Sequence, residues 1–135
     1  MTLVIFACVH NAGRSQMAAA WFNALVDPER ATAMSAGTEP GTRVHPEVLE
    51  AMNEVGIDVS GAKPKLLTAP MVGEARHLIT MGCGDACPII PHWVVRDDWP
   101  LEDPKGKPIA RVRMIRDEIR TRVEKLIAEN DWKPK

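Results

Sequence analysis

Residues 2–15 read TLVIFACVHNAGRS and define the first unit of the fold. Residues 2–7 form a continuous apolar run rich in β-branched side chains, which predicts a strand buried within a parallel sheet. A polar loop follows, and apolar side chains then recur at helical spacing over residues 15–25. A buried strand that passes through a short loop into a helix is the opening unit of an α/β fold.

The rest of the chain repeats this alternation. Further strands are predicted at residues 32–36, 77–81 and 93–95, and helices at residues 46–55, 66–72 and 109–127. Strands that alternate with helices predict a parallel sheet with right-handed crossovers, whose functional sites form at the carboxyl ends of the strands. The arginines of the last helix are interleaved with acidic residues, and we interpret them as a solvated surface: Arg111, Arg113, Arg116, Arg120 and Arg122.

Composition limits the possible functions. A length of 135 residues with 45% hydrophobic residues fits one compact domain, residues 1–135. The 17 basic and 18 acidic residues give a net charge of −1, which argues against a general nucleic-acid binder. The apolar runs are too short for a membrane span or a signal peptide, so we expect a cytoplasmic protein. In a reducing compartment its three cysteines are expected to be catalytic, redox-active or metal-binding.

The loop after the first strand has the properties of an oxyanion site. Its backbone N–H groups are expected to converge at the positive end of a helix dipole, which suits a tetrahedral anion. Five residues separate Cys8 from Arg14, so both side chains can reach one anion, and the planar guanidinium can hold two of its oxygens. The same field favours a nucleophilic Cys8 thiolate. The predicted oxyanion-binding residues are Val9, His10, Asn11, Ala12, Gly13, Arg14 and Ser15.

The other two thiols, Cys83 and Cys87, lie in a predicted loop over residues 83–91. Three intervening residues allow a disulfide if the loop turns, because the two Cα atoms must approach within ~7 Å. The alternative is a metal site that adds His92, with His77 not far away in the sequence. Zinc sites prefer a clearer pair-plus-pair spacing, so we expect no metal. For Cys8 and Arg14, the alternative is a buried structural thiol and a surface ion-pair partner.

Several segments together resemble one family. The loop at residues 8–18, the tetrapeptide at 35–38, the helix end at 56–58, and residues 83–91 and 99–104 are similar to low-molecular-weight protein tyrosine phosphatases and to the arsenate reductases that share their fold. The resemblance implies a three-layer α/β/α structure with a four-stranded parallel sheet. It also implies that Asp103, in the step Asp103–Pro104, is the general acid, whereas a simpler interpretation makes Asp103 a turn residue.

The number of thiols separates the two branches of this family. A phosphatase needs one thiol and no electrons, whereas arsenate reduction needs two electrons that a pair of thiols can supply. The resemblance to thioredoxin-coupled arsenate reductases implies attack by Cys8, then relay through Cys83 and Cys87 to thioredoxin. In other relatives a small thiol, mycothiol or glutathione, acts with a glutaredoxin-like protein. No tightly bound cofactor is expected, and a potassium site of some relatives is not expected because Ala19 replaces its carboxylate.

Two other functions are weighed against the reductase. A phosphotyrosine phosphatase acting through a Cys8 phospho-intermediate usually places aromatic residues beside the Asp–Pro step, but here Lys105 follows and the chain contains no Tyr. A thiol or metal sensor would be favoured by a basic, DNA-binding pattern, which we do not find. The sequence therefore predicts an arsenate reductase with the catalytic residues Cys8, Arg14, Cys83, Cys87 and Asp103.

Overall fold

A computed structural model describes residues 1–82 and 90–134 of the chain. The helices and strands are β1 (Thr2–Cys8), α1 (Arg14–Leu25), β2 (Ala31–Gly37), α2 (Pro46–Glu54), α3 (Ala69–Glu74), β3 (His77–Thr80), β4 (Val95–Asp98) and α4 (Ile109–Glu129). Cys83 and Cys87 lie outside the described residues. In the described ranges, no helix combines the length and the apolar character that crossing a membrane requires.

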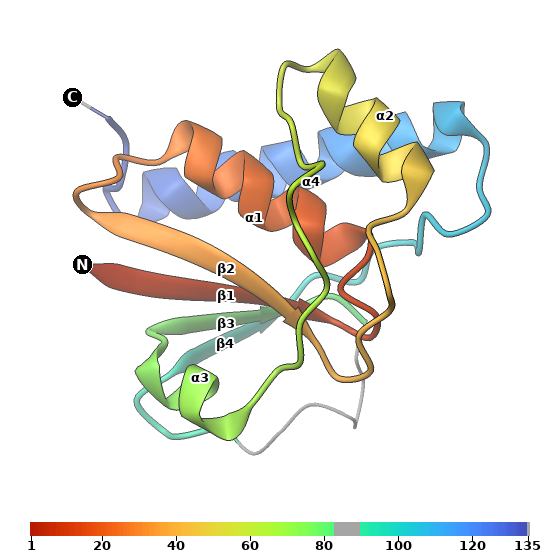
Figure 1. Ribbon diagram of the computed structural model, residues 1–135. Helices are drawn as coiled ribbons and strands as arrows, with labels where there is room; N and C mark the ends of the chain where they lie inside the picture. The colour runs from red at the N-terminus through yellow and green to blue at the C-terminus, as the bar shows by residue number, and fades with distance from the viewer. Residues whose placement is uncertain (83–89, 135) are drawn as a thin grey trace.

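The four strands form one parallel sheet in the order β2-β1-β3-β4. Helices α1, α2 and α4 cover one face of this sheet, and the short helix α3 covers the other (Figure 1). The predicted three-layer α/β/α fold with a four-stranded parallel sheet is therefore confirmed. Because every pairing is parallel, the carboxyl ends of all four strands lie at the same edge of the sheet.

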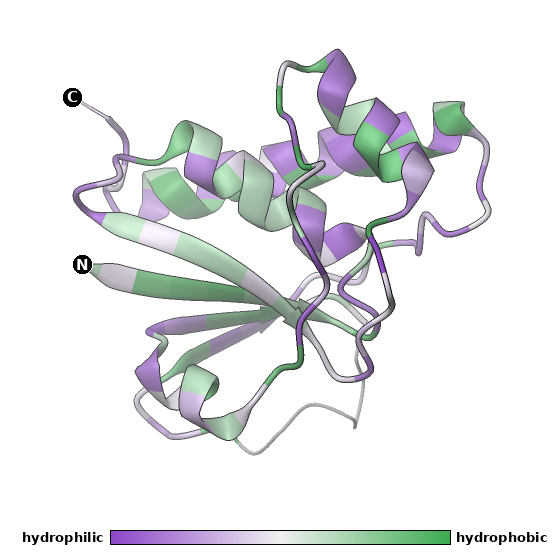
Figure 2. Ribbon diagram, viewed as in Figure 1, coloured by the Kyte–Doolittle hydropathy of each residue, from purple (hydrophilic) through white to green (hydrophobic). Residues whose placement is uncertain are grey.

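Strand β1 is hydrophobic along nearly its whole length because both of its faces are buried (Figure 2). Val4, Phe6 and Cys8 belong to the larger hydrophobic cluster, which includes residues of α1, α2 and α4. Ile5 and Ala7 point to the other face and pack in the smaller cluster with residues of α3. Because side chains alternate along a strand, Cys8 at the end of β1 is directed to the α1 side of the sheet.

The predicted strand at residues 93–95 is wrong in its position. Strand β4 begins at Val95 and pairs with β3 through Asp98, in the register His77↔Val95 to Thr80↔Asp98. All four residues of β4, one of the two edge strands of the sheet, are exposed. The prediction followed the apolar side chains of residues 93–95, whereas hydrogen-bonded pairing with β3 determines where the strand begins and ends.

Helix α3 begins later than predicted. Residues 66 and 67 are extended and follow β2, with a bridge between Gly37 and Leu66 and a hydrogen bond from the Leu67 N–H to the Gly37 carbonyl. Thr68 then caps the helix, because its Oγ1 accepts a hydrogen bond from the Met71 N–H at 3.4 Å. The leucines that suggested a helix from residue 66 therefore belong to the connection that precedes it.

The interpretation of all five α4 arginines as a solvated surface is wrong for Arg116. This side chain is buried, and its Nη1 donates to the Ala51 carbonyl and to Glu54 Oε1, each at 2.9 Å. Arg113 donates to the same carboxylate at 2.6 Å. Hydrogen bonds from Arg113 and Arg116 lower the pKa of Glu54 to about 2, so this group holds the end of α2 against α4 as a carboxylate.

Candidate oxyanion site

The loop that carries the predicted site lies at the carboxyl edge of the sheet. Cys8 ends β1 opposite Gly37, the last residue of β2, and Ala7 pairs with Thr80 at the end of β3. Residues 9–13 cross this edge, and helix α1 begins at Arg14. The sequence therefore places the loop correctly, between a strand that ends and a helix that begins.

The Cys8 sulfur is held by two hydrogen-bonding groups. Only 2% of Cys8 is exposed, and its Sγ lies 2.8 Å from Ser15 Oγ. The backbone N–H of Asn11 donates to the same sulfur at 3.3 Å. Asn11 Nδ2 donates to Ser15 Oγ at 2.7 Å, which leaves the hydroxyl proton of Ser15 free to point at the sulfur. Two donors directed at one sulfur are the arrangement that stabilises a thiolate.

Asn11 adopts a left-handed backbone conformation with φ 51° and is fully buried. Asparagine tolerates this conformation better than most residues. Its Oδ1 accepts hydrogen bonds from the Lys65 N–H at 3.0 Å and from Gln16 Nε2 at 3.2 Å. Gln16 Nε2 also donates to the Asn11 carbonyl at 3.0 Å. The turn of the loop is thus fixed by groups on α1 and on the connection before α3.

The loop is pressed closely against the end of β2. A Cβ atom on Gly37 would lie 2.5 Å from the Val9 carbonyl oxygen and 2.9 Å from the Asn11 nitrogen. The Glu39 N–H donates to the Val9 carbonyl at 2.8 Å, so the chain after β2 lies along the loop. Any side chain at position 37 would force the loop outward, which explains why glycine ends this strand.

Arg14 and Asp103 come together although they are far apart in the sequence. Arg14 Nη2 lies 3.8 Å from Asp103 Oδ2, and Arg14 Nη1 donates to the Leu101 carbonyl at 3.1 Å. The Arg14 side chain is 11% exposed and that of Asp103 is 46% exposed. The guanidinium is therefore positioned by the segment after β4, while the carboxyl group remains open to solvent and to a bound molecule.

The Asp103–Pro104 step packs directly on the loop. A Cβ atom on Gly13 would lie 2.8 Å from Pro104 Cγ and 3.4 Å from His45 Cδ2. His45 precedes α2, and its backbone N–H donates to the Ala12 carbonyl at 2.9 Å. Burial lowers the pKa of His45, against an opposing effect of the Asp103 charge. The loop, the residue before α2 and the Asp103–Pro104 step therefore meet at Gly13.

Two histidines weighed in the sequence lie at opposite ends of the sheet. His10 lies at the rim of the loop, where its Nδ1 is 3.0 Å from the Glu39 carbonyl oxygen. His77, considered as a metal ligand, begins β3 at the opposite edge of the sheet and packs against Trp132, with ring centroids 5.3 Å apart. Among residues 1–82 and 90–134, no three His, Cys, Asp or Glu side chains are grouped to hold a metal ion.

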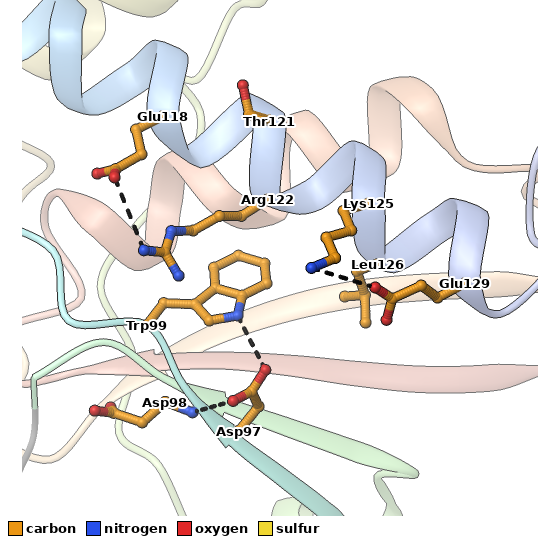
Figure 3. A pocket seen from close by; sticks show the side chains of 9 residues that line it. All are labelled: Asp97, Asp98, Trp99, Glu118, Thr121, Arg122, Lys125, Leu126 and Glu129. Carbon is orange, nitrogen blue, oxygen red and sulfur yellow. Dashed lines mark hydrogen bonds and ion pairs between the residues drawn. The ribbon is translucent and has the colours of Figure 1, made fainter.

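A cleft between β4 and α4 has no comparable chemistry. Figure 3 shows Trp99 in it, with its Nε1 donating to Asp97 Oδ2 at 3.3 Å. Arg122 pairs with Glu118 at 3.8 Å, and Lys125 with Glu129 at 3.7 Å. The cationic groups of this cleft are thus already paired with carboxylates, and no thiol from residues 1–82 or 90–134 lines it.

Sequence reasoning missed three groups that position the site: the amide of Gln16, the backbone N–H of Lys65 and the carbonyl of Leu101. Gln16 directly follows Ser15, so an amide next to the loop was the one available signal. The other two are backbone groups, which every residue carries and which no motif can single out.

The chain is similar to known proteins over most of its length. Residues 3–133 match the family described as low molecular weight phosphotyrosine protein phosphatase. An arsenate reductase of Staphylococcus haemolyticus is 37% identical over 124 residues, which are 90% of this chain and 92% of that protein.

Solved structures of arsenate reductases are similar to this chain as well. A thioredoxin-dependent arsenate reductase of Corynebacterium glutamicum is 38% identical with a TM-score of 0.82, covering 96% of this chain. The match spans only 61% of that longer protein. An arsenate reductase in a phosphate-binding state is 34% identical with a TM-score of 0.83, covering 96% of this chain and 98% of the other.

Proposed function

The chain belongs to the low molecular weight phosphotyrosine protein phosphatase family, and we propose that it reduces arsenate to arsenite with Cys8 as the nucleophile. Its similarity to arsenate reductases over 90% of its length makes it an arsenate reductase. The role of Cys8 is supported by its sulfur, which is buried and lies within hydrogen-bond distance of Ser15 Oγ and the Asn11 N–H.

The first step is attack on a bound arsenate. The loop N–H groups and the Arg14 guanidinium hold the anion, and the Cys8 thiolate forms a bond to arsenic. The As–O bond opposite the sulfur breaks, and Asp103 gives its proton to the departing oxygen, which leaves as water. The exposed carboxyl group of Asp103, 3.8 Å from Arg14, supports this role because it lies beside the anion-binding group.

The second step transfers two electrons to arsenic. Cys83 attacks the Cys8 sulfur, the electron pair of the S–As bond moves to arsenic, and arsenite leaves. Cys87 then attacks Cys83, which frees the Cys8 thiolate and forms a Cys83–Cys87 disulfide. This relay is supported by the position of Gly82, the residue before Cys83, since a Cβ atom there would lie 2.7 Å from Arg14 Nη1. The chain thus enters the segment of both cysteines directly beside the anion site.

A thiol reductant restores the enzyme. We propose thioredoxin, whose two thiols reduce the Cys83–Cys87 disulfide by exchange. The alternative is a small thiol, mycothiol or glutathione, that attacks the arseno-cysteine on Cys8 and leaves a mixed disulfide for a glutaredoxin-like protein.

Single-turnover measurements on three serine variants test the relay. The wild type should give multiple turnovers with thioredoxin, and Cys8→Ser should give no arsenite. Cys87→Ser should release one arsenite per protein and stop, with a Cys8–Cys83 disulfide identified by mass spectrometry. Cys83→Ser should release none with thioredoxin alone. If Cys87→Ser turns over as fast as the wild type, the three-thiol relay is wrong.

The same variants distinguish the reductants and the phosphatase alternative. If mycothiol or glutathione restores multiple turnover to Cys83→Ser, the small-thiol route operates. Hydrolysis of an aryl phosphate serves as the control, because it needs Cys8 but neither Cys83 nor Cys87. Strong aryl phosphate hydrolysis without any arsenate reduction would overturn the proposed function.

A further inference from the structure

We propose that Gln16 is a positioning residue that fixes the direction of the hydrogen bonds running from Asn11 through Ser15 to the Cys8 sulfur. This inference rests on the proposed role of Cys8 as the nucleophile. Gln16 makes no contact with the sulfur and acts through the side-chain amide of Asn11.

Backbone groups determine which way both amides face. The Lys65 N–H can only donate, so the Asn11 side-chain atom 3.0 Å from it must be the oxygen. The Asn11 carbonyl can only accept, so the Gln16 atom 3.0 Å from it must be the nitrogen. Gln16 Nε2 therefore gives Asn11 Oδ1 a second donor at 3.2 Å. Neither assignment depends on telling nitrogen from oxygen within an amide.

The direction of the remaining bonds follows from these two. With its oxygen held by two donors, Asn11 must turn its NH₂ group to Ser15 Oγ, 2.7 Å away. Ser15 accepts that bond and has one proton left, which can be donated to Cys8 Sγ at 2.8 Å. Gln16 is only 6% exposed, and Asn11 and Ser15 are fully buried, so water does not compete for these groups.

A substitution that reverses the amide should therefore weaken the thiolate. In Gln16→Glu the new carboxylate has only acceptors and would face the Asn11 carbonyl and Oδ1. A charge-assisted hydrogen bond to the Asn11 NH₂ group is stronger than the neutral one from Lys65, so the amide is expected to rotate. Ser15 would then face Asn11 Oδ1 and donate its proton there instead of to the sulfur.

The test is the pH dependence of Cys8 alkylation by iodoacetamide, followed by mass spectrometry of the peptide that contains it. We expect the midpoint of alkylation to rise by about one pH unit in Gln16→Glu, a ~10-fold loss of thiolate below the midpoint. Gln16→Met, which has similar size and no charge, should shift the midpoint in the same direction by a smaller amount.

A matched variant separates the amide from simple charge. Ala20→Glu places a carboxylate one turn further along α1, where Gln16 and Ala20 line the same groove. Ala20→Glu should shift the midpoint of Cys8 alkylation only slightly, and this shift should disappear in 0.5 M salt. The shift in Gln16→Glu should persist at the same salt concentration. Asp103 and His45 are the charged or titratable groups that reach the loop from other segments, His10 and Arg14 belong to the loop and the start of α1, and every variant keeps all four.

The outcomes are distinct. Unchanged midpoints in Gln16→Glu and Gln16→Met, with both variants folded by circular dichroism, would overturn the positioning role. Equal shifts in Gln16→Glu and Ala20→Glu that both disappear with salt would also overturn it, because charge alone would explain them. Alkylation requires no arsenate, so failure of the proposed function would appear separately, as a wild-type protein without arsenate reduction.

Discussion

Gly13→Ala should slow the first chemical step while leaving the anion site occupied normally. A Cβ atom at this position would lie 2.8 Å from Pro104 Cγ and 3.3 Å from Pro104 Cδ. A proline ring cannot turn aside as a flexible side chain can. The segment that carries Asp103 must therefore move away from the loop, and with it the proposed proton donor.

The size of the effect follows from the displacement. Ordinary carbon contacts begin near 3.4 Å, so Pro104 must move by at least about 0.6 Å. A 1 Å misplacement of a reacting group can cost ~100-fold in rate, so we expect a loss of about 10-fold to 100-fold. Overpacking of this kind also lowers the free energy of unfolding by about 1–3 kcal/mol. Phosphate should still bind within about 3-fold of its wild-type affinity, because the added carbon meets Pro104 and His45, whereas the Arg14 guanidinium is held at the Leu101 carbonyl, three residues before Pro104.

A double-mutant cycle with Asp103→Asn measures whether the loss passes through the acid. Single-turnover arsenite formation is compared in the wild type, Gly13→Ala, Asp103→Asn and the double variant, with phosphate affinity measured by calorimetry. Gly41→Ala is the matched control, since a Cβ atom there would lie 3.8 Å from the His10 carbonyl oxygen, an ordinary contact. It should react at the wild-type rate.

Gly13→Ala should have little further effect on the rate of arsenite formation once Asp103 is replaced. If it slows Asp103→Asn as much as it slows the wild type, the displaced Asp103 segment is not the cause. A large loss of phosphate affinity would equally contradict the argument, because it would show damage to the anion site.

Two further predictions concern Arg14 and Glu54. Gly82→Ala places a Cβ atom 2.7 Å from Arg14 Nη1 and should weaken phosphate binding about 10-fold by displacing the guanidinium. Gly106→Ala is the control in calorimetry, because Gly106 also has positive φ but no atom within 4 Å of the added carbon. Hydrogen bonds, chiefly from Arg113 and also from Arg116, lower the pKa of Glu54 from 4.5 to about 2. The Glu54 carboxylate therefore contributes fully to the free energy of unfolding above pH 4.5, and this contribution is lost as the pH falls towards 2. Urea unfolding at pH 3 and pH 7 should therefore change less with pH in Glu54→Gln than in the wild type, and an equal change would contradict this assignment.

The local features of the site could be predicted because they depend on neighbours in the chain. The apolar run of β1 is buried on both faces, so its composition alone identifies an interior strand. Cys8 ends β1 and Arg14 begins α1, so the sequence by itself places these two residues at the two ends of one short loop. The alternation of strands and helices likewise restricts the sheet to parallel pairing, which then places the loop at the carboxyl edge.

Contacts between distant segments were decided only in the folded chain. The apolar residues 93–95 predicted the last strand, but pairing of Val95 with His77 determines that β4 begins at Val95. The burial of Arg116 depends on the Ala51 carbonyl, which is 65 positions away. Arg14 meets the Leu101 carbonyl across 87 positions. Such contacts form because packing of the sheet and helices brings their backbones together, and local patterns of hydrophobicity do not carry that information.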